Sequence, residues 1–374
     1  MATALANCCR VCAKCGRTST GRAGARCRAG RPPGGREGTV PGLAEIAEAA
    51  GVSISTVSRV LNRRPGVNDE TRRRVLKVLT EKPYAPRGLG ALQRTGTLGL
   101  LVPELSNPVF PAFAEALETR AAGRGYSSVL CNTRSATMRE EEYVRMLLAR
   151  GVEGMVFVSP ESTDSAASHD HYRQLKAEGV HMVFVNGGMP SLDVPEVGVD
   201  EQAAGYLATR HLLELGHRRI GFVSGPSRSM PSRLKAAGWV VALEEAGVGH
   251  SVDLIATAPY GPAGGAAAMA RLLETVRPTA VICSSDLMAL GAISEAQHRG
   301  LQVPRDLSVV GFDDIPLASY CTPALTTLAQ PIPEIAAAAV DGLLAELESD
   351  PAPAHSRVFR PRLVVRDSTA APPH

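Results

Sequence analysis

The chain has 374 residues, of which 44% are apolar, 21% are charged and 4% are aromatic, and its formal net charge is +3. This composition is typical of a globular protein of two or three domains, and it excludes wholesale disorder and collagen-like repeats. No stretch approaches the roughly 18 unbroken apolar residues of a membrane span. The basic N-terminus lacks the apolar segment of a secretory signal, so we expect a cytoplasmic protein.

The net charge is unevenly distributed along the chain. Residues 1–38 carry eight basic residues and one Glu, giving +7, and residues 39–87 carry nine basic and five acidic residues, giving +4. Residues 88–374 carry 23 basic and 31 acidic residues, giving −8. A basic head on an acidic body predicts a polyanion-binding module joined to a second unit.

Residues 1–38 are rich in Gly, Arg, Ala and Cys and have no hydrophobic period, which is typical of a disordered extension. Three cysteines have a zinc-ligand spacing (Cys9-x-x-Cys12-x-x-Cys15), but only Cys27 follows them in place of a second pair. We therefore predict no metal site, with zinc binding as the alternative. A second alternative is a translation start at Val40, which would remove this segment.

The first helical pattern predicts a DNA-reading unit. Apolar residues recur at helical spacing from Leu43 to Ala50, Gly51 supplies the positive φ of a tight turn, and Ser53 is a good N-cap for a second helix. Asn68 caps a third helix that carries Arg72, Arg73, Arg74 and Lys77. Two short helices joined by such a turn predict a helix-turn-helix. The alternative is a generic helical hairpin whose arginines are only solvated.

A recognition helix presents its N-terminal side chains to base edges in the major groove. Arg59 suits a bidentate pair with guanine, Ser55 suits several bases, and Ile54 suits a thymine methyl group. The predicted DNA contacts of this unit are Ile54, Ser55, Thr56, Ser58, Arg59, Asn62 and Arg63.

Beyond residue 95 the chain alternates apolar strands with amphipathic helices, which predicts parallel sheets covered on both faces. The predicted strands are 98–102, 128–131, 155–158, 182–185, 220–223, 280–283 and 308–312, with a late strand at 358–365. The predicted helices are 110–123, 138–149, 169–178, 201–215, 232–246, 263–276, 287–298 and 332–347. The count fits an α/β core of two doubly wound lobes.

No enzyme or cofactor signature is found. The chain has no G-x-S-x-G elbow, P-loop, dinucleotide fingerprint after a strand, or H-E-x-x-H motif. Asp313 and Asp314 look like a carboxylate pair, but neighbours on an extended segment point to opposite sides. His217 follows a helix stop and is interpreted as structural. We predict neither catalysis nor a cofactor.

Six segments of the chain stand out together: "AEAAGVSISTVSRVLN" (47–62), "GLLVPELSNPVF" (99–110), "LGHRRIGFVSGP" (215–226), "SSDLMALGA" (284–292), "LSVVGFDD" (307–314) and "PALTTLAQP" (323–331). In their order and spacing they resemble the lactose/galactose repressor (LacI-type) family of bacterial transcription regulators. The resemblance covers residues 39–370. It implies a helix-turn-helix domain at 39–87, a hinge at 88–96 and a periplasmic-binding-protein-like core at 97–374. Lobe one would comprise about 97–199 and 332–359, and lobe two about 200–331 and 360–370.

The resemblance also implies a hinge helix that wedges a leucine into the minor groove. Leu92 is the candidate wedge, and Leu89 is the alternative. The hinge is about three residues shorter than the family pattern and contains two glycines, each costing roughly 1 kcal/mol of helix stability. This departure puts the hinge helix in question.

The resemblance places a small effector between the lobes. Asp286 follows a predicted buried strand, at the mouth where α/β sheets bind ligands, although an N-cap role is the alternative. Lys235 stands where the family has an Arg, and Arg233 is a substitute for it. Core packing is the alternative for Phe110, and a turn role for Asn186. The predicted effector contacts are Phe110, Asn186, Arg233, Lys235, Trp239, Tyr260 and Asp286, with Arg228 as a further candidate.

These features predict a ligand-responsive repressor that reads a near-palindromic operator as a homodimer. Its effector, by resemblance alone, is a sugar or a sugar derivative, and binding would change operator affinity through a coupling free energy of typically about 1–3 kcal/mol. The alternative is a solute-binding receptor without DNA function, which would require export. A hydrolase or kinase is a more distant alternative.

Overall fold

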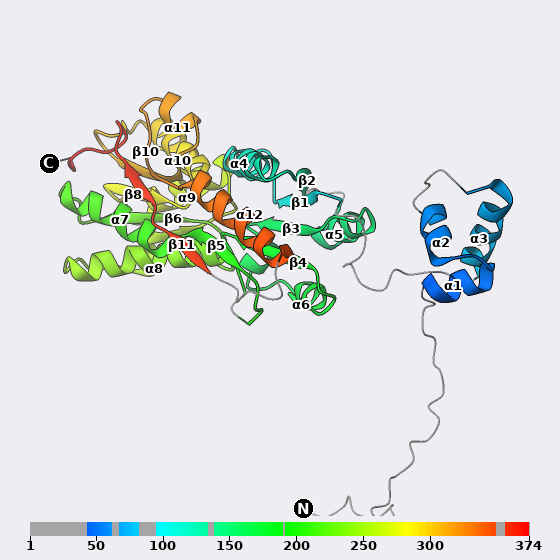
Figure 1. The fold of residues 1–374 in the computed structure, drawn as a ribbon. Coiled ribbons are helices and arrows are strands. Elements are labelled where there is room, and N and C mark those ends of the chain that lie inside the picture. The colour runs from blue at the N-terminus through cyan, green and yellow to red at the C-terminus, as the bar shows by residue number, and fades with distance from the viewer. Residues whose placement is uncertain are drawn as a thin grey trace, which may run out of the picture. The chain divides into compact units, whose positions relative to one another are not determined.

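The computed structural model describes residues 43–61, 67–81, 95–133, 138–189, 191–348 and 356–373. The chain divides into two compact units between residues 91 and 92, and the elements of both are drawn in Figure 1. The cysteine-rich segment and the predicted contacts Asn62, Arg63 and Leu92 lie outside the described residues.

In its described part, the first unit has three helices, α1 (Leu43–Ala50), α2 (Ile54–Leu61) and α3 (Asp69–Glu81). Gly51 adopts a φ of +62°, so the chain reverses directly after α1. Asn68 caps α3, because its Oδ1 accepts the Thr71 N–H at 2.8 Å. A small apolar core joins the three helices and comprises Ile46, Ala47, Ala50, Val57, Val60 and Val75.

The described residues of the second unit form two six-stranded sheets. The lobe-one sheet has the order β11-β5-β4-β3-β1-β2. Its strands are β1 (Thr97–Val102), β2 (Ser127–Asn132), β3 (Gly154–Val158), β4 (His181–Val185), β5 (Glu196–Val199) and β11 (Arg357–Phe359). Its helices are α4 (Val109–Gly123), α5 (Glu140–Ala149), α6 (Asp170–Ala177) and α12 (Ile332–Glu348), with a 3₁₀ turn, η1 (Glu161–Thr163). The helix α12 contacts α4 and strands β3, β4 and β5.

The lobe-two sheet has the order β12-β10-β9-β8-β6-β7. Its strands are β6 (Ile220–Ser224), β7 (Ile255–Thr257), β8 (Ala280–Cys283), β9 (Ser308–Asp313), β10 (Thr326–Ala329) and β12 (Arg362–Val364). Its helices are α7 (Glu201–Glu214), α8 (Met230–Glu245), α9 (Pro262–Thr275), α10 (Asp286–His298) and α11 (Leu317–Tyr320), with a 3₁₀ turn, η2 (Val252–Leu254). The predicted α/β core of two doubly wound lobes is confirmed.

The structure corrects four details of the predicted strands. The late strand predicted at 358–365 is two strands, with β11 parallel to β5 in lobe one and β12 antiparallel to β10 in lobe two. Pro361 lies between them, and because it has no backbone N–H it interrupts the ladder. Strands β5, β7 and β10 were not predicted, because each has only three or four residues and includes polar or small ones, so it forms neither an apolar run nor a visible period.

Where the structure describes it, the chain passes between the lobes three times, at β5–α7, β10–α12 and β11–β12. Strands β3, β6, β8 and β9 are buried along their whole length, as expected for parallel strands covered on both faces. One apolar cluster includes side chains of both sheets, so the lobes share a packed boundary. No helix in the described part of the chain is long and apolar enough to cross a membrane.

Candidate functional site

The N-terminal end of α2 presents polar and apolar side chains to solvent. Ser53 caps the helix, because its Oγ accepts the Thr56 N–H at 3.2 Å. The same Oγ lies 2.8 Å from the hydroxyls of both Ser55 and Thr56. Ile54 is 52% exposed and Ser55 is exposed, whereas Val57 packs into the core. An exposed apolar side chain beside hydroxyls, at the start of a second helix, is the arrangement expected of a base-reading surface.

Ser58 and Arg59 belong to α2, but their side chains lie outside the described part of the structure. Helix α3 adds exposed basic side chains, including Arg74 and Lys77. Long cations of this kind suit the phosphate backbone of a duplex.

A pocket lies between the two lobes of the second unit, at the carboxyl ends of their strands. The pocket is partly open to solvent, and its cavity volume is about 80 Å³, which is smaller than that of most small-molecule sites. Lobe one and the crossing segments contribute Glu104, Asn107, Val109, Phe110, Phe113, Ser159, Thr163, Asn186 and Gln330. Lobe two contributes Glu201, Ser229, Pro231, Lys235, Tyr260, Ser284, Ser285, Phe312 and Asp313.

A buried ion pair forms one wall of this pocket. The Lys235 Nζ contacts Glu201 Oε2, and both side chains are almost fully buried. The same Nζ lies 3.8 Å from the centre of the Phe312 ring, which is a cation–π contact. Burial is the largest single influence and would lower the pKa of Lys235, but the charge and hydrogen bond of Glu201, together with Tyr260 and Asp313, outweigh it and raise that pKa. Lys235 is therefore a charged donor at the pocket wall.

Aromatic rings form the apolar part of the lining. The Tyr260 hydroxyl lies 2.6 Å from Ser232 Oγ and 3.2 Å from Ser229 Oγ, which ties it to the first turn of α8. A side chain at Gly225 would meet the Tyr260 ring at 2.6 Å, so glycine makes room for it. Phe110 and Phe312 add aromatic side chains beside the polar groups of the lining, a combination common in small-molecule sites.

A chain of amide and carboxylate groups crosses the lobe boundary inside the pocket. The Asn186 Nδ2 donates to Gln330 Oε1 at 2.8 Å, and the Gln330 Nε2 donates to Asp313 Oδ1 at 2.7 Å. Asn186 Oδ1 also accepts the Val199 N–H at 2.9 Å. Burial and the nearby Asp286 charge raise the pKa of Asp313. The end of β4, the crossing segment after β10 and the end of β9 are therefore joined at the pocket surface.

Four of the seven predicted effector residues are brought together in the pocket lining: Phe110, Asn186, Lys235 and Tyr260. Arg233 lies on the exposed face of α8. Trp239 is fully buried and contacts Phe222, at 6.2 Å between ring centres.

Asp286 is fully buried and does not line the pocket. Its Oδ2 accepts the Ile315 N–H at 2.8 Å, and its Oδ1 accepts the Thr327 hydroxyl at 2.5 Å. The N-cap of α10 is Ser285, whose Oγ accepts the Met288 N–H at 3.3 Å.

Glu201, Gln330 and Asp313 also line the pocket, although sequence reasoning did not select them as effector contacts. Asp313 ends strand β9, so the rule that selected Asp286 after β8 applied equally to it. Glu201 and Gln330 lie where the chain passes between lobes, a position without a local sequence signal.

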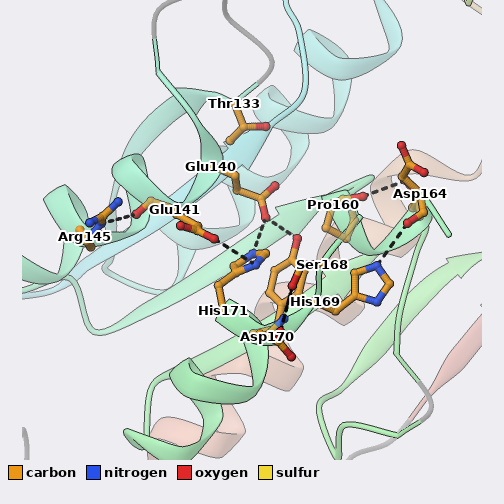
Figure 2. Close-up of polar contacts among 12 residues, drawn as sticks. Thr133, Glu140, Glu141, Arg145, Pro160, Asp164, Ser168, His169, Asp170 and His171 are labelled. Atoms are coloured by element: carbon orange, nitrogen blue, oxygen red, sulfur yellow. Dashed lines mark hydrogen bonds and ion pairs between the residues drawn. The ribbon is translucent and has the colours of Figure 1, made fainter. Parts of the chain in front are cut away.

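The loop after η1 reaches across the pocket to lobe two. The Asp164 Oδ2 lies 2.9 Å from Arg228 Nε, and the Ser165 N–H donates to the Arg228 carbonyl at 3.0 Å. The loop is held on its own side as well, because Asp164 Oδ1 accepts the Ala166 N–H at 3.0 Å. His169 Nε2 also lies 3.2 Å from the Asp164 carbonyl oxygen (Figure 2). Thr163 and Ser229, the neighbours of this ion pair, line the pocket.

A second polar cluster lies within lobe one, between α5 and α6. Glu140 is the first residue of α5 and is 2% exposed, and its Oε1 accepts the Tyr172 hydroxyl. His171 lies between Glu140 and Glu141, at 3.4 Å and 3.8 Å (Figure 2). These contacts join α5 to α6. No group of three or more His, Cys, Asp and Glu among the described residues is placed to hold a metal ion.

A helix-turn-helix unit joined to a two-lobed α/β core defines the class of DNA-binding regulators with a periplasmic-binding-protein-like core. Residues 42–87 match the family model described as bacterial regulatory proteins, lacI family, and residues 209–369 match that of a periplasmic binding protein-like domain. The chain belongs to the LacI family of bacterial regulatory proteins.

Curated relatives match nearly the whole chain. An HTH-type transcriptional regulator from the aml 5′ region of Streptomyces limosus is 44% identical over 344 residues, which cover 90% of this chain and 97% of the relative. The HTH-type transcriptional regulator MalR of Streptomyces coelicolor is 43% identical over 337 residues, which cover 88% and 97%. The chain is, like them, a transcriptional regulator with a helix-turn-helix.

Solved structures share the fold of both units. The transcriptional regulator CelR–cellobiose complex has a TM-score of 0.66 and 30% identity, covering 88% of this chain and 99% of that one. The lac repressor dimer bound to operator and the anti-inducer ONPF has a TM-score of 0.66 and 28% identity, covering 89% and 100%.

Proposed function

We propose that this regulator represses transcription by binding a near-palindromic operator as a homodimer, and that a neutral sugar in the interlobe pocket controls its operator affinity. The pocket carries the proposal: it is built from both lobes, and it combines ring faces with amide, hydroxyl and carboxylate groups. The similar CelR structure is a complex with cellobiose. The proposed action is binding without catalysis, in the bacterial cytoplasm where the chromosome lies.

On the DNA side, α2 is the proposed recognition helix. Ile54, Ser55 and Arg59 would read base edges, with Thr56, Ser58 and Asn62 beside them. Arg63 and the basic residues of α3 would contact phosphates, and Leu92 would act in the hinge. The exposure of Ile54 and Ser55 at the start of α2 supports this assignment.

The proposed effector contacts are of two kinds. Asn186, Lys235, Asp313 and Gln330 supply donors and acceptors for hydroxyl groups, and Phe110, Tyr260 and Phe312 supply ring faces. The only cation among the lining residues, Lys235, is already paired with Glu201, and Glu104 and Asp313 add further acidic groups. This charge balance favours a neutral sugar over a phosphorylated one. Arg233, Trp239 and Asp286 are not among the proposed contacts.

The pocket also supports a mechanism of control. A ligand that contacts both lobes stabilises their closed arrangement, because it binds that state better than any state in which the lobes are apart. The Asp164–Arg228 ion pair and the Asn186–Gln330–Asp313 chain connect the same two lobes. Ligand binding and lobe arrangement are therefore linked at this site. A change in lobe arrangement would in turn change the affinity of the DNA-binding units for the operator.

The test is a gel shift of the full-length protein on the DNA upstream of its own gene, at moderate salt, combined with a thermal-shift screen against neutral and phosphorylated sugars. The expected result is sequence-specific binding that one neutral sugar changes while raising the melting temperature. Specific binding that no sugar alters would contradict the effector assignment, and binding to all DNA alike would contradict the operator assignment.

A further inference from the structure

Asp286 lies beneath the pocket, where it supports a turn. It is the first residue of α10 and is fully buried. One carboxylate oxygen accepts the Ile315 N–H at 2.8 Å and the other accepts the Thr327 hydroxyl at 2.5 Å. Asp286 thus joins the start of α10 to the segment after β9 and to strand β10.

The segment that Asp286 holds has an unusual backbone. Asp313 has a φ of 121° and Asp314 a φ of 58°, a region that residues with a side chain rarely occupy. Such a conformation persists only when surrounding contacts enforce it. Ile315, whose N–H Asp286 accepts, is the next residue along the chain.

The Arg366 side chain also contacts this turn. Arg366 Nη2 donates to Asp314 Oδ1 at 2.6 Å, and its Nη1 donates to the Leu325 carbonyl at 2.8 Å. The guanidinium group therefore ties Asp314 to the segment that leads into β10. Asp286 and Arg366 hold consecutive residues of one turn, through a backbone group and a side chain respectively.

Strand β9 leaves room for the buried carboxylate. A Cβ at Gly311 would lie 2.2 Å from Asp286 Oδ1 and 2.8 Å from a Leu325 methyl group. Any side chain at this position would displace Asp286 from under the turn. Glycine is needed here for a close approach and not for a positive φ.

The turn directs Asp313 into the pocket. Its carboxylate lines the cavity and accepts the Gln330 amide at 2.7 Å. We propose that Asp286 and Arg366 are positioning residues, which hold the 313–315 turn so that the Asp313 carboxylate faces the effector without touching it themselves. The part that concerns the effector rests on the proposed function.

The first test needs no ligand. Amide hydrogen exchange of the full-length protein is compared for wild type, Asp286→Ala, Asp286→Asn and Arg366→Gln. Asp286→Ala and Arg366→Gln should speed exchange in peptides covering 313–316 by about tenfold or more, with strands β1 to β5 unchanged. Asp286→Asn keeps an oxygen for the Ile315 N–H and an amide for the Thr327 hydroxyl, so it should restore slow exchange. Arg366→Gln removes a different contact of the same turn, the one to Asp314. It therefore still tests the proposal if Asp286→Ala does not fold.

Thr209→Val is the matched control, because it removes another buried hydrogen bond of lobe two, from Thr209 Oγ1 to the Gly205 carbonyl. It should leave exchange at 313–316 unchanged. Unchanged exchange in both Asp286→Ala and Arg366→Gln would overturn the proposal. Equal acceleration by Thr209→Val would also overturn it, because the effect would then be a general loss of stability.

The second test is calorimetric titration with whichever of cellobiose, maltose or ribose raises the melting temperature of the wild type. Asp286→Ala should weaken binding about tenfold or more, and Asp286→Asn should recover most of it. Unchanged affinity in a folded Asp286→Ala protein would overturn the positioning role. If none of the sugars binds the wild type, the sugar assignment fails, and the exchange result still decides whether Asp286 and Arg366 hold the turn.

Discussion

Arg228 of lobe two and Asp164 of lobe one form an ion pair beside the pocket, with 2.9 Å between Nε and Oδ2. A backbone bridge between Asp164 and Ser229 lies next to it, so the same short segments carry both a charge contact and a hydrogen-bonded contact. Since Thr163 and Ser229 line the pocket, this link is placed to respond to whether the cavity is filled.

Arg228→Ala should weaken sugar binding by about two- to fivefold and change the melting temperature little. The Arg228 side chain is 64% exposed, and exposed ion pairs contribute about 0.2–1 kcal/mol. Calorimetric titration measures the affinity. Arg210→Ala is the control, because the Arg210–Glu214 pair lies within α7 and joins no lobes. Equal loss of affinity in both variants would argue against a link at Arg228.

Lys235→Met should destabilise the protein by about 3–5 kcal/mol, because it leaves the Glu201 carboxylate buried without its partner. The double variant Lys235→Met with Glu201→Leu should recover much of that stability, since a buried pair can be replaced by apolar groups at little cost. Sugar binding should remain lost in both. Urea unfolding and calorimetric titration measure the two effects separately. Recovery of binding in the double variant would exclude Lys235 as an effector contact.

Asp286 should make stability depend on pH. Burial raises its pKa to about 6 from an ordinary 3.8, and the charge of Asp314 adds to this. Between these values the folded protein binds a proton that the unfolded chain has released, so this group lowers the free energy of unfolding as pH rises from about 4 to 6. The full effect is of the order of 3 kcal/mol.

Asp286→Asn removes this titration. As the pH rises from about 4 to 6, the free energy of unfolding of the variant should therefore increase relative to that of the wild type. Urea unfolding at half-unit pH steps measures it. Because other buried carboxylates titrate in both proteins, only the difference is informative. Parallel curves for the two proteins would show that Asp286 does not titrate in this range.

Arg59→Ala and Arg74→Ala should affect DNA binding differently. Arg59 is a proposed base contact, so its loss should cost about 1–3 kcal/mol on the operator and relax preference at one base pair. Arg74 is exposed on α3, and its loss should weaken binding to all sequences alike and reduce the salt dependence by about one ion. Gel shifts on operator variants at two salt concentrations distinguish them. A uniform effect of Arg59→Ala would contradict its reading role.

The helix-turn-helix was predictable because its determinants are local. Gly51 has the positive φ that the turn requires, Ser53 caps α2, and the apolar stripe that includes Val57 forms the core. The alternation of buried strands and helices was equally local, and it predicted two doubly wound lobes. These features follow from the conformational preferences and periods of neighbouring residues.

The roles of Asp286 and Asp313 could not be predicted from local sequence patterns. Asp313 ends strand β9 and Asp286 follows strand β8 by three residues, so the sequence alone determined that both lie near the mouth of the sheet. Only the tertiary structure decided that Gly311 admits Asp286 beneath β9, where Thr327 and Ile315 occupy its oxygens, and that Asp313 lines the pocket. Thr327 is 41 residues from Asp286. The direction and partners of a buried side chain depend on such distant contacts, and a local pattern does not contain them.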